Sequence, residues 1–391
     1  VALRNRMFVS HSKVVSLLLA IMTMITWGTN KIAVKYLTYP VSLYTIDFFV
    51  WVFIFHTILS LTLGARWFPD DNKDAFQNIF DIIKRGPSHY WRQLGGPFIA
   101  GATTMGFTLI MFVLVDGYGL TSAIPLLFGS SMLIGVIITY LMEPKGNPWL
   151  IFIGVGVLFF AVVLNTISSN MNQKCQKKKM EEDAKKAESS EPAAAPAEPA
   201  APAAPAAEPT AESAESITMP LVEEEPKKLL SMKAFITLGI SAAVCDVFYA
   251  PCTAMGKDPS GVLSLSPYGV FQIVSLASVV VVFPFAYIVM RHPLKGPKCG
   301  WKDYFGASWA QRWPAIWSAG LLALGNFGYA SAGDSLGYAI GYALSRGTLL
   351  VSALLGVFVY KEFSGADCPT WTTQIIALLL FVTAILLEAF A

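Results

Sequence analysis

Residues 320–362 read GLLALGNFGYASAGDSLGYAIGYALSRGTLLVSALLGVFVYKE, and residues 101–143 read GATTMGFTLIMFVLVDGYGLTSAIPLLFGSSMLIGVIITYLME. In both stretches two glycines five positions apart begin an apolar run that leads to a lone aspartate, Asp116 or Asp334. A glycine follows three residues later, another lies ten residues beyond it, and each stretch ends on a glutamate. Apolar runs of this length are typical of membrane-spanning helices. The pattern predicts two long helices joined by a tight Asp/Gly turn in each stretch, and therefore a duplicated membrane protein.

The composition also favours a membrane protein, because 54% of the 391 residues are hydrophobic and 14% are charged, against about 25% charged residues in soluble domains. A net charge of +2 argues against a nucleic-acid partner. The five cysteines show no spacing typical of a disulfide framework or a zinc site. Motifs for hydrolytic catalysis and for ATP binding are absent from the sequence, so we expect neither an enzyme nor an ATP-driven pump, and no metal or cofactor.

Hydropathy predicts ten spanning helices of about 20 residues each. They cover Val14–Tyr36, Val41–Gly64, Leu94–Val115, Tyr118–Met142, Pro148–Ile167, Lys233–Met255, Tyr268–Met290, Pro314–Gly333, Leu336–Tyr360 and Thr370–Ala389. Because the first five are an odd number, the second five enter the membrane from the opposite side. The predicted fold is an all-α polytopic membrane protein with ten transmembrane helices as a 5+5 inverted repeat, an arrangement found in alternating-access transporters.

The predicted organisation has four parts. They are an N-terminal tail (1–13), a first repeat with helices one to five (14–167), a linker (168–230) and a second repeat with helices six to ten (231–391). The linker is rich in Ala, Pro and Glu and is predicted to be disordered; the alternative for its first part is a charged continuation of helix five. Lys and Arg are more numerous on the linker's side, which predicts a cytoplasmic linker. Because the chain begins with Val1 rather than Met, we expect residues upstream of it.

Two charged residues lie near the middle of predicted helices, Asp246 in the sixth and Arg346 in the ninth. Ionisable groups inside a membrane are costly and usually face a cavity or each other. One hypothesis is that both residues line a central cavity and bind or gate a polar solute. The alternative is a structural ion pair between neighbouring helices.

The first and sixth helices carry polar and aromatic residues in corresponding places. Trp27 and Asn30 belong to WGTNK at the end of helix one, and Tyr249 precedes Pro251 in helix six. A proline frees a helical carbonyl, and such breaks mark binding regions in transporters. Lys31 is expected to extend to the membrane interface, with a place in the binding region as the alternative.

Helix two holds Asp47 and His56, and with Asp246 they are candidates for proton coupling. A solvated aspartate and a packed histidine are the alternatives. Helices eight and nine add amide and aromatic side chains, among them Asn326 and Tyr342. Such side chains suit sugars and flat heterocycles equally well.

The 5+5 arrangement, the WGTNK motif and the matching ends of helices four and nine (ITYLMEPKGNPWL and VFVYKEFSGADCP) resemble the drug/metabolite transporter superfamily. Within it, the chain is most similar to the branch of ureide permeases and glucose- and rhamnose-uptake permeases. The resemblance implies a secondary carrier with its cavity between helices one to four and six to nine. Carried over by position, it implies the substrate-binding residues Trp27, Asn30, Asp246, Tyr249, Asn326, Tyr342 and Arg346.

We therefore expect a secondary transporter that moves a small polar organic solute across a lipid bilayer by alternating access. The first expectation for the solute is a sugar or sugar-like metabolite, and ureides, purines or nucleotide-sugars are the alternative. A non-transporting membrane scaffold or subunit with a transporter fold is the alternative of another class. A homodimer is compatible with either.

Overall fold

The computed structural model describes residues 12–64, 74–118, 120–142, 144–189, 232–258, 263–293 and 297–391. These residues form helices joined by short connections, and no β-strand occurs among them. Residues 190–230 of the predicted linker and residues 1–11 of the predicted tail lie outside the described ranges.

The helices of the first half cover every range for which hydropathy predicted one. They are α1 (Lys13–Thr29), the 3-10 helix η1 (Asn30–Tyr36), α2 (Val41–Thr62), α3 (Ala75–Lys84), α4 (Pro87–Gln93), α5 (Gly95–Tyr118), α6 (Leu120–Met142) and α7 (Pro148–Ser189). Those of the second half are α8 (Met232–Val247), α9 (Tyr249–Ala254), α10 (Pro267–Arg291), α11 (Trp301–Gly306), α12 (Trp309–Leu336), α13 (Tyr338–Ser345), α14 (Thr348–Leu354), a π-helical turn (Leu355–Val359) and α15 (Cys368–Ala389).

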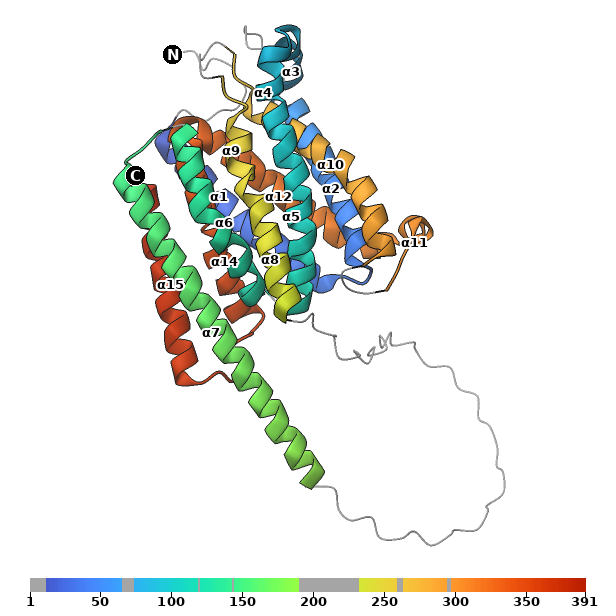
Figure 1. Cartoon of the computed structure of the whole chain (residues 1–391), viewed down its shortest axis with the longest axis vertical. Coiled ribbons are helices and arrows are strands. Elements are labelled where there is room, and N and C mark those ends of the chain that lie inside the picture. Colours follow the sequence, from blue (N-terminus) through green and yellow to red (C-terminus); the bar gives the residue numbers. More distant parts are fainter. Residues whose placement is uncertain are drawn as a thin grey trace, which may run out of the picture.

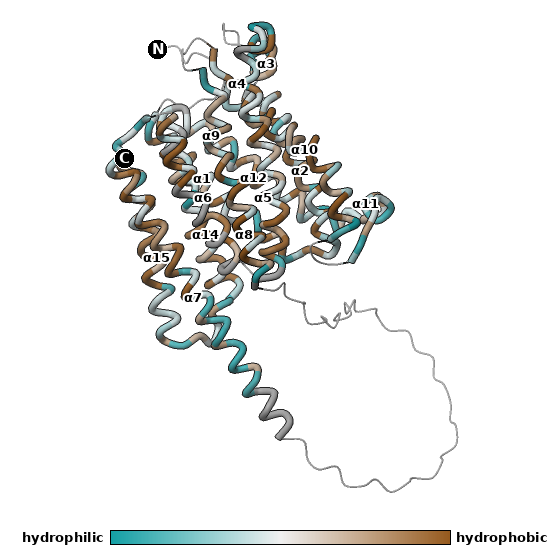
Figure 2. Tube along the Cα trace, in the orientation of Figure 1, coloured by the Kyte–Doolittle hydropathy of each residue, from teal (hydrophilic) through white to brown (hydrophobic). Residues whose placement is uncertain are grey.

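Within the described residues, eight helical stretches are long and apolar enough to cross a membrane, and the chain is a polytopic membrane protein. These stretches are Lys13–Tyr36, Val41–Thr62, Tyr90–Asp116, Pro148–Glu182, Lys233–Ala254, Pro267–Arg291, Ile340–Val359 and Cys368–Ala389. Figure 2 shows that the residues along these stretches are mostly hydrophobic, whereas those of α11 and of the part of α7 that projects from the bundle, up to its grey end, are mostly hydrophilic. The two further predicted ranges are also helical, in α6 and α12.

Helix α7 is longer than the span predicted for it, because it continues past Ile167 to Ser189. The first part of the predicted linker is therefore a charged continuation of the fifth helix in this structure. Its side chains hold the loop before α15, since Asn172 and Gln176 both donate hydrogen bonds to the carbonyl of Glu362. We call the end of the bundle from which α7 projects the linker side (Figure 1).

The two halves pack against each other rather than standing apart. Helix α12 packs on α1, and α10 packs on both α2 and α5, so each of these contacts joins the first half to the second. Helices α7 and α15 form a separate pair along one flank of the bundle (Figure 1). The centre of the bundle is surrounded by α1, α2, α5, α6, α8–α10 and α12–α13.

The helix boundaries have local causes in the sequence. Ser266 accepts a hydrogen bond from the backbone of Gly269 at the start of α10, and Asp367 accepts one from Thr370 at the start of α15, which satisfies amide groups that lack a partner within the helix. Gly337, in the predicted Asp/Gly turn, has φ +91 and separates α12 from α13. Residues with a Cβ rarely adopt this conformation, so the turn requires a glycine.

Candidate functional site

A cavity of about 70 Å³ lies at the centre of the bundle. One water molecule needs about 10–15 Å³, so the cavity has room for several. It is bordered by Trp27, Asn30, Lys31, Phe48, Phe49, Val52, His56, Thr104, Phe107, Thr108, Met111, Phe128, Asp246, Tyr249, Val274, Ser275, Ser278, Leu322, Asn326 and Arg346. Both halves of the chain contribute to it.

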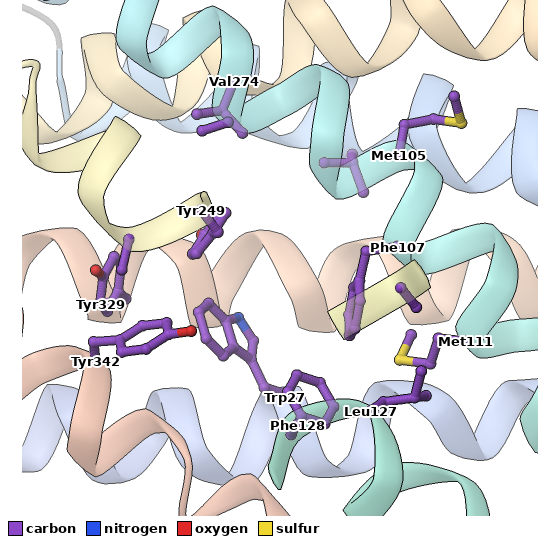
Figure 3. Packing of buried hydrophobic residues seen from close by; sticks show 14 of the residues in the cluster. Trp27, Met105, Phe107, Met111, Leu127, Phe128, Tyr249, Val274, Tyr329 and Tyr342 are labelled. Carbon is purple, nitrogen blue, oxygen red and sulfur yellow. The ribbon is translucent and has the colours of Figure 1, made fainter. Parts of the chain in front are cut away.

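Aromatic rings form part of the cavity wall. The rings of Trp27 and Tyr249 meet edge to face with 6.1 Å between centroids, and Phe107 meets Phe128 at 5.1 Å. Figure 3 shows these four side chains around the same space, with the ring nitrogen of Trp27 on the side of Tyr249 and Phe107. Aromatic walls combined with polar groups that point into the same space are typical of sites that bind small organic molecules.

Asp246 and Arg346 form an ion pair at the border of the cavity, with 2.8 Å between Nη2 and Oδ2. The same carboxylate oxygen accepts a hydrogen bond from Ser131 at 2.5 Å. Arg346 also donates a hydrogen bond to the hydroxyl of Tyr342. Its guanidinium stacks on the Tyr342 ring, with 4.1 Å between Cζ of Arg346 and the ring centroid. The two hypotheses for this pair are therefore compatible, because the residues pair with each other and also border open space.

Tyr342 is one predicted binding residue that does not line the cavity. It is fully buried behind Arg346, and its hydroxyl lies 3.5 Å from Oδ2 of Asp246. Its ring also fills the space beside Gly135, where an added Cβ would lie 2.8 Å from it. Tyr342 therefore positions the ion pair from behind.

Lys31 does not extend to the membrane interface as expected; it is 2% exposed and borders the cavity. Its Nζ donates to the carbonyl of Trp27 at 2.6 Å and lies 3.4 Å from Oγ1 of Thr348. The reason is local: the α-helix ends at Thr29, and the carbonyls of this last turn accept bonds from side chains. Lys31 therefore belongs to the site.

Three interruptions of helices lie next to cavity residues. Helix α1 changes to a 3-10 helix at Asn30, α8 stops before Phe248, and α13 stops before Arg346. The interruption at Phe248 agrees with the predicted effect of Pro251, because a proline has no N–H group to donate to the carbonyl of Val247. Interrupted helices expose backbone polar groups, which transporters use at binding sites.

His56 and Asn326 face each other across the cavity border, with 3.3 Å between Nε2 and Nδ2. Among the described residues, no partner is found for four buried polar atoms of cavity residues: Nε1 of Trp27, Oδ1 of Asn30, Nδ1 of His56 and Nε of Arg346. Buried polar atoms are nearly always hydrogen-bonded in proteins. These atoms therefore have unused hydrogen-bonding capacity, which a molecule or water bound in the cavity would use.

Asp47 lies away from the cavity, on the linker side. Its carboxylate contacts Arg312 at 2.6 Å, Tyr39 at 2.8 Å and Tyr304 at 2.9 Å. Burial, followed by the charge of Asp47, raises the pKa of the Tyr304 phenol to about 12, so this hydroxyl stays protonated and donates. The contacts of Asp47 are structural ones between α2 and the region of α11 and α12; proton coupling at Asp47, His56 or Asp246 stays a prediction.

Several residues of the site were missed by the sequence interpretation. Phe128 and Ser131 contact the charged groups directly, and Thr108 borders the cavity. Ser131 stands in a small-residue seam with Gly135, a pattern that indicates packing. The available signal was its place in the first of the two repeated stretches, as a small polar residue within an apolar helix.

Comparison with known proteins gives a family and a fold. The sequence model of the ureide permease family matches residues 44–389. Among the solved structures similar to the chain, one crystal structure covers 96% of each chain with a TM-score of 0.52 and 14% sequence identity, which is a likeness of fold alone. No curated protein sequence matches the chain.

Proposed function

The chain belongs to the ureide permease family, and from this premise we propose that it carries small ureides across a membrane by alternating access. A ureide contains C=O and N–H groups side by side on a flat skeleton. It therefore matches the unpartnered donor and acceptor atoms of the cavity and its aromatic walls. The observation that carries the proposal is this set of unpartnered atoms, on Trp27, Asn30, His56 and Arg346.

In this proposal ten helices span the membrane, with α6 and α12 added to the eight apolar stretches, as a 5+5 inverted repeat. The corresponding interruptions at Asn30 in the first half and at Phe248 in the second support a repeat. The excess of Lys and Arg on the linker side supports a cytoplasmic linker. Binding at the centre, between the halves, then allows the two halves to rock around the solute.

The sugar expectation receives no support from the family. Sugar hydroxyls also donate and accept hydrogen bonds, so the cavity alone does not separate the two classes. A non-transporting scaffold requires the Asp246–Arg346 pair to fill the centre, and the open space beside the pair supports transport instead. We therefore place ureides first, and sugars are the comparison in the test.

The test is ligand-dependent thermal stability of the purified full-length protein, followed by uptake into proteoliposomes. A ligand that binds the folded state stabilises it by about 2.7 kcal/mol at a hundredfold excess over its dissociation constant. We expect hydantoin, a simple cyclic ureide, to raise the midpoint and glucose to leave it unchanged. A shift with glucose alone would overturn the ureide proposal.

The variant for this test is Asn30→Ala, which removes an unpartnered carbonyl of the cavity. Its control is Asn165→Ala, which removes a buried asparagine bonded to Gln374 between α7 and α15. We expect Asn30→Ala to lose the hydantoin shift and Asn165→Ala to keep it, although the latter starts from a lower midpoint. Equal hydantoin-dependent midpoint shifts in both variants would show that this cavity is not the binding site.

A further inference from the structure

The central cavity has more positive than negative charge. Among its bordering residues Lys31 and Arg346 are basic, and Asp246 is the acidic one. Both basic groups lie against the ring of Phe128, with Nζ of Lys31 4.9 Å and Cζ of Arg346 4.7 Å from its centroid. The three charged residues and the ring therefore form one buried cluster.

The carboxylate of Asp246 pairs with Arg346 and not with Lys31. Asp246 pairs with Arg346 at 2.8 Å and also accepts the Ser131 hydroxyl. Within the described part of the chain, Lys31 makes no ion pair; its two oxygen partners, at 2.6 and 3.4 Å, are both uncharged. An ammonium group has three N–H donors, so Lys31 has donor capacity left for a molecule in the cavity.

Burying a cation without a counter-ion is expensive, and such groups inside membranes usually serve function. We propose that the missing counter-ion is supplied by the solute, which carries a carboxylate beside its ureido group. This inference rests on the proposed function and names the solute class more narrowly. Lys31 binds the carboxylate, while the ureido group completes the cavity's uncharged polar atoms.

The spacing of the residues supports an organic anion rather than an inorganic one. Trp27, Asn30 and Lys31 are three and four positions apart, so they lie on the same face at the junction of α1 and η1. The unpartnered N–H of Trp27 and the unpartnered carbonyl of Asn30 therefore lie within one helical turn of the ammonium group. An inorganic anion satisfies the charge but leaves the carbonyl of Asn30 without a donor.

Hydantoin and its ring-opened form, N-carbamoylglycine, provide a matched pair of probes. They contain the same urea atoms, but ring opening by water converts one amide into a carboxylate, so the second probe is an anion at neutral pH. We expect the wild-type protein to bind N-carbamoylglycine at least about tenfold more tightly than hydantoin. A hydrogen bond to a charged group is stronger than one between neutral groups, and tenfold in affinity corresponds to about 1.4 kcal/mol.

The variants are Lys31→Met, which keeps the length of the side chain and removes its charge, and Lys31→Arg, which keeps the charge. Lys35→Met is the control, because Lys35 lies one turn further along η1 and pairs with Glu362 outside the cavity. We expect Lys31→Met to lose the preference for the anion, because it weakens binding of N-carbamoylglycine at least about tenfold more than binding of hydantoin. Lys31→Arg and Lys35→Met are expected to keep the preference.

Four outcomes decide between the possibilities. Loss of the preference in Lys31→Met and its retention in Lys31→Arg support the inference. Equal affinity of the two probes in the wild-type protein, a measurement that needs no variant, overturns it and leaves the ureide proposal intact. Stabilisation by chloride that equals stabilisation by N-carbamoylglycine assigns Lys31 to inorganic anions and also overturns it. Binding of neither probe overturns the proposed function together with this inference.

Discussion

At the scale of single residues, Gly325 leaves the space that the indole ring of Trp27 occupies. A Cβ at residue 325 would overlap the indole ring and lie 2.6 Å from Oγ1 of Thr26. By contrast, a Cβ at Gly320, about one and a half turns earlier in α12, would meet only Phe55, at an ordinary 3.6 Å. The same substitution therefore has different consequences at the two glycines.

We predict that Gly325→Ala displaces Trp27 into the cavity, weakens ligand binding and destabilises the protein by about 1–3 kcal/mol, the usual cost of overpacking. Gly320→Ala is expected to leave binding unchanged and to stabilise the helix slightly, because alanine favours helices over glycine. Thermal unfolding in detergent and ligand titration measure both effects. Similar behaviour of the two variants would contradict this account of Trp27.

The Asp246–Arg346 pair allows stability to be separated from transport. We predict that Asp246→Asn costs about 3–5 kcal/mol, because it leaves the guanidinium buried without its counter-ion. In the double variant Asp246→Asn/Arg346→Gln no such charge remains, and much of the stability is expected to return. Uptake is expected to stay absent in both variants if the pair belongs to the site.

Unfolding midpoints and uptake into proteoliposomes measure the two properties on the same preparations. A purely structural pair gives the opposite result for the double variant, in which uptake would return together with stability. Ser131 is a third position at which the ion pair can be probed, because its hydroxyl donates to the Asp246 oxygen that also binds Arg346.

At the scale of the element, α7 both flanks the bundle and holds the loop before α15. Gln176 donates to the carbonyl of Glu362 at 2.7 Å, and Lys179 donates to that of Gly365 at 2.7 Å. The loop itself contains unusual backbone, with φ +50 at Lys361 and +78 at Gly365. The extension of α7 therefore contributes to the order of this loop.

We predict that Gln176→Ala speeds amide hydrogen exchange in residues 361–367 by about fivefold, because one hydrogen bond contributes about 1 kcal/mol. Lys177→Ala is the matched control: its side chain is exposed on the same helix and is expected to leave exchange unchanged. Exchange measured by mass spectrometry on the two variants checks this. Unchanged rates in Gln176→Ala would show that the loop is ordered without α7.

For the whole molecule, the linker-side contact between Asp47 and Arg312 joins the first half to the second. Arg312 also donates to the carbonyl of Ala307 and stacks on Tyr304, so one side chain holds α2, α11 and the start of α12 together. Cys299 also contacts the first half, with its sulfur 3.3 Å from Oγ of Ser42 at the start of α2. A cysteine at this place reports whether the halves separate on this side.

We predict that Arg312→Ala increases the rate at which a maleimide labels Cys299, in a background where the other four cysteines are serine. The control is Arg291→Ala, which removes an arginine that stacks on Tyr287 at the end of α10, also on the linker side. Labelling rates in detergent compare the two, and equal rates would show that the Asp47–Arg312 contact does not keep this side closed.

The sequence alone predicted the helices well, because length and hydropathy determine which segments lipid accepts. Each predicted range contains helix among its described residues, although the sixth is interrupted at Phe248 and the ninth at Arg346. The Asp/Gly turn of the second repeated stretch is formed by Gly337. Charged residues in the middle of apolar segments also stood out, which is why Asp246 and Arg346 were found. These properties depend on the local chain and on its solvent.

The sequence could not indicate the partners of those charged residues. Whether Asp246 meets Arg346, whether Lys31 extends to the interface or stays inside, and whether Asp47 borders the cavity all depend on how helices that are distant in the sequence pack together. Phe128 illustrates the difference: it is one aromatic residue among many in an apolar helix, and only packing brings Lys31 and Arg346 to its ring. The sequence determined the helices because each helix satisfies its own backbone, whereas the tertiary structure decided the site because contacts such as Asp246–Arg346 and Lys31–Thr348 join residues that are 100 and 317 positions apart.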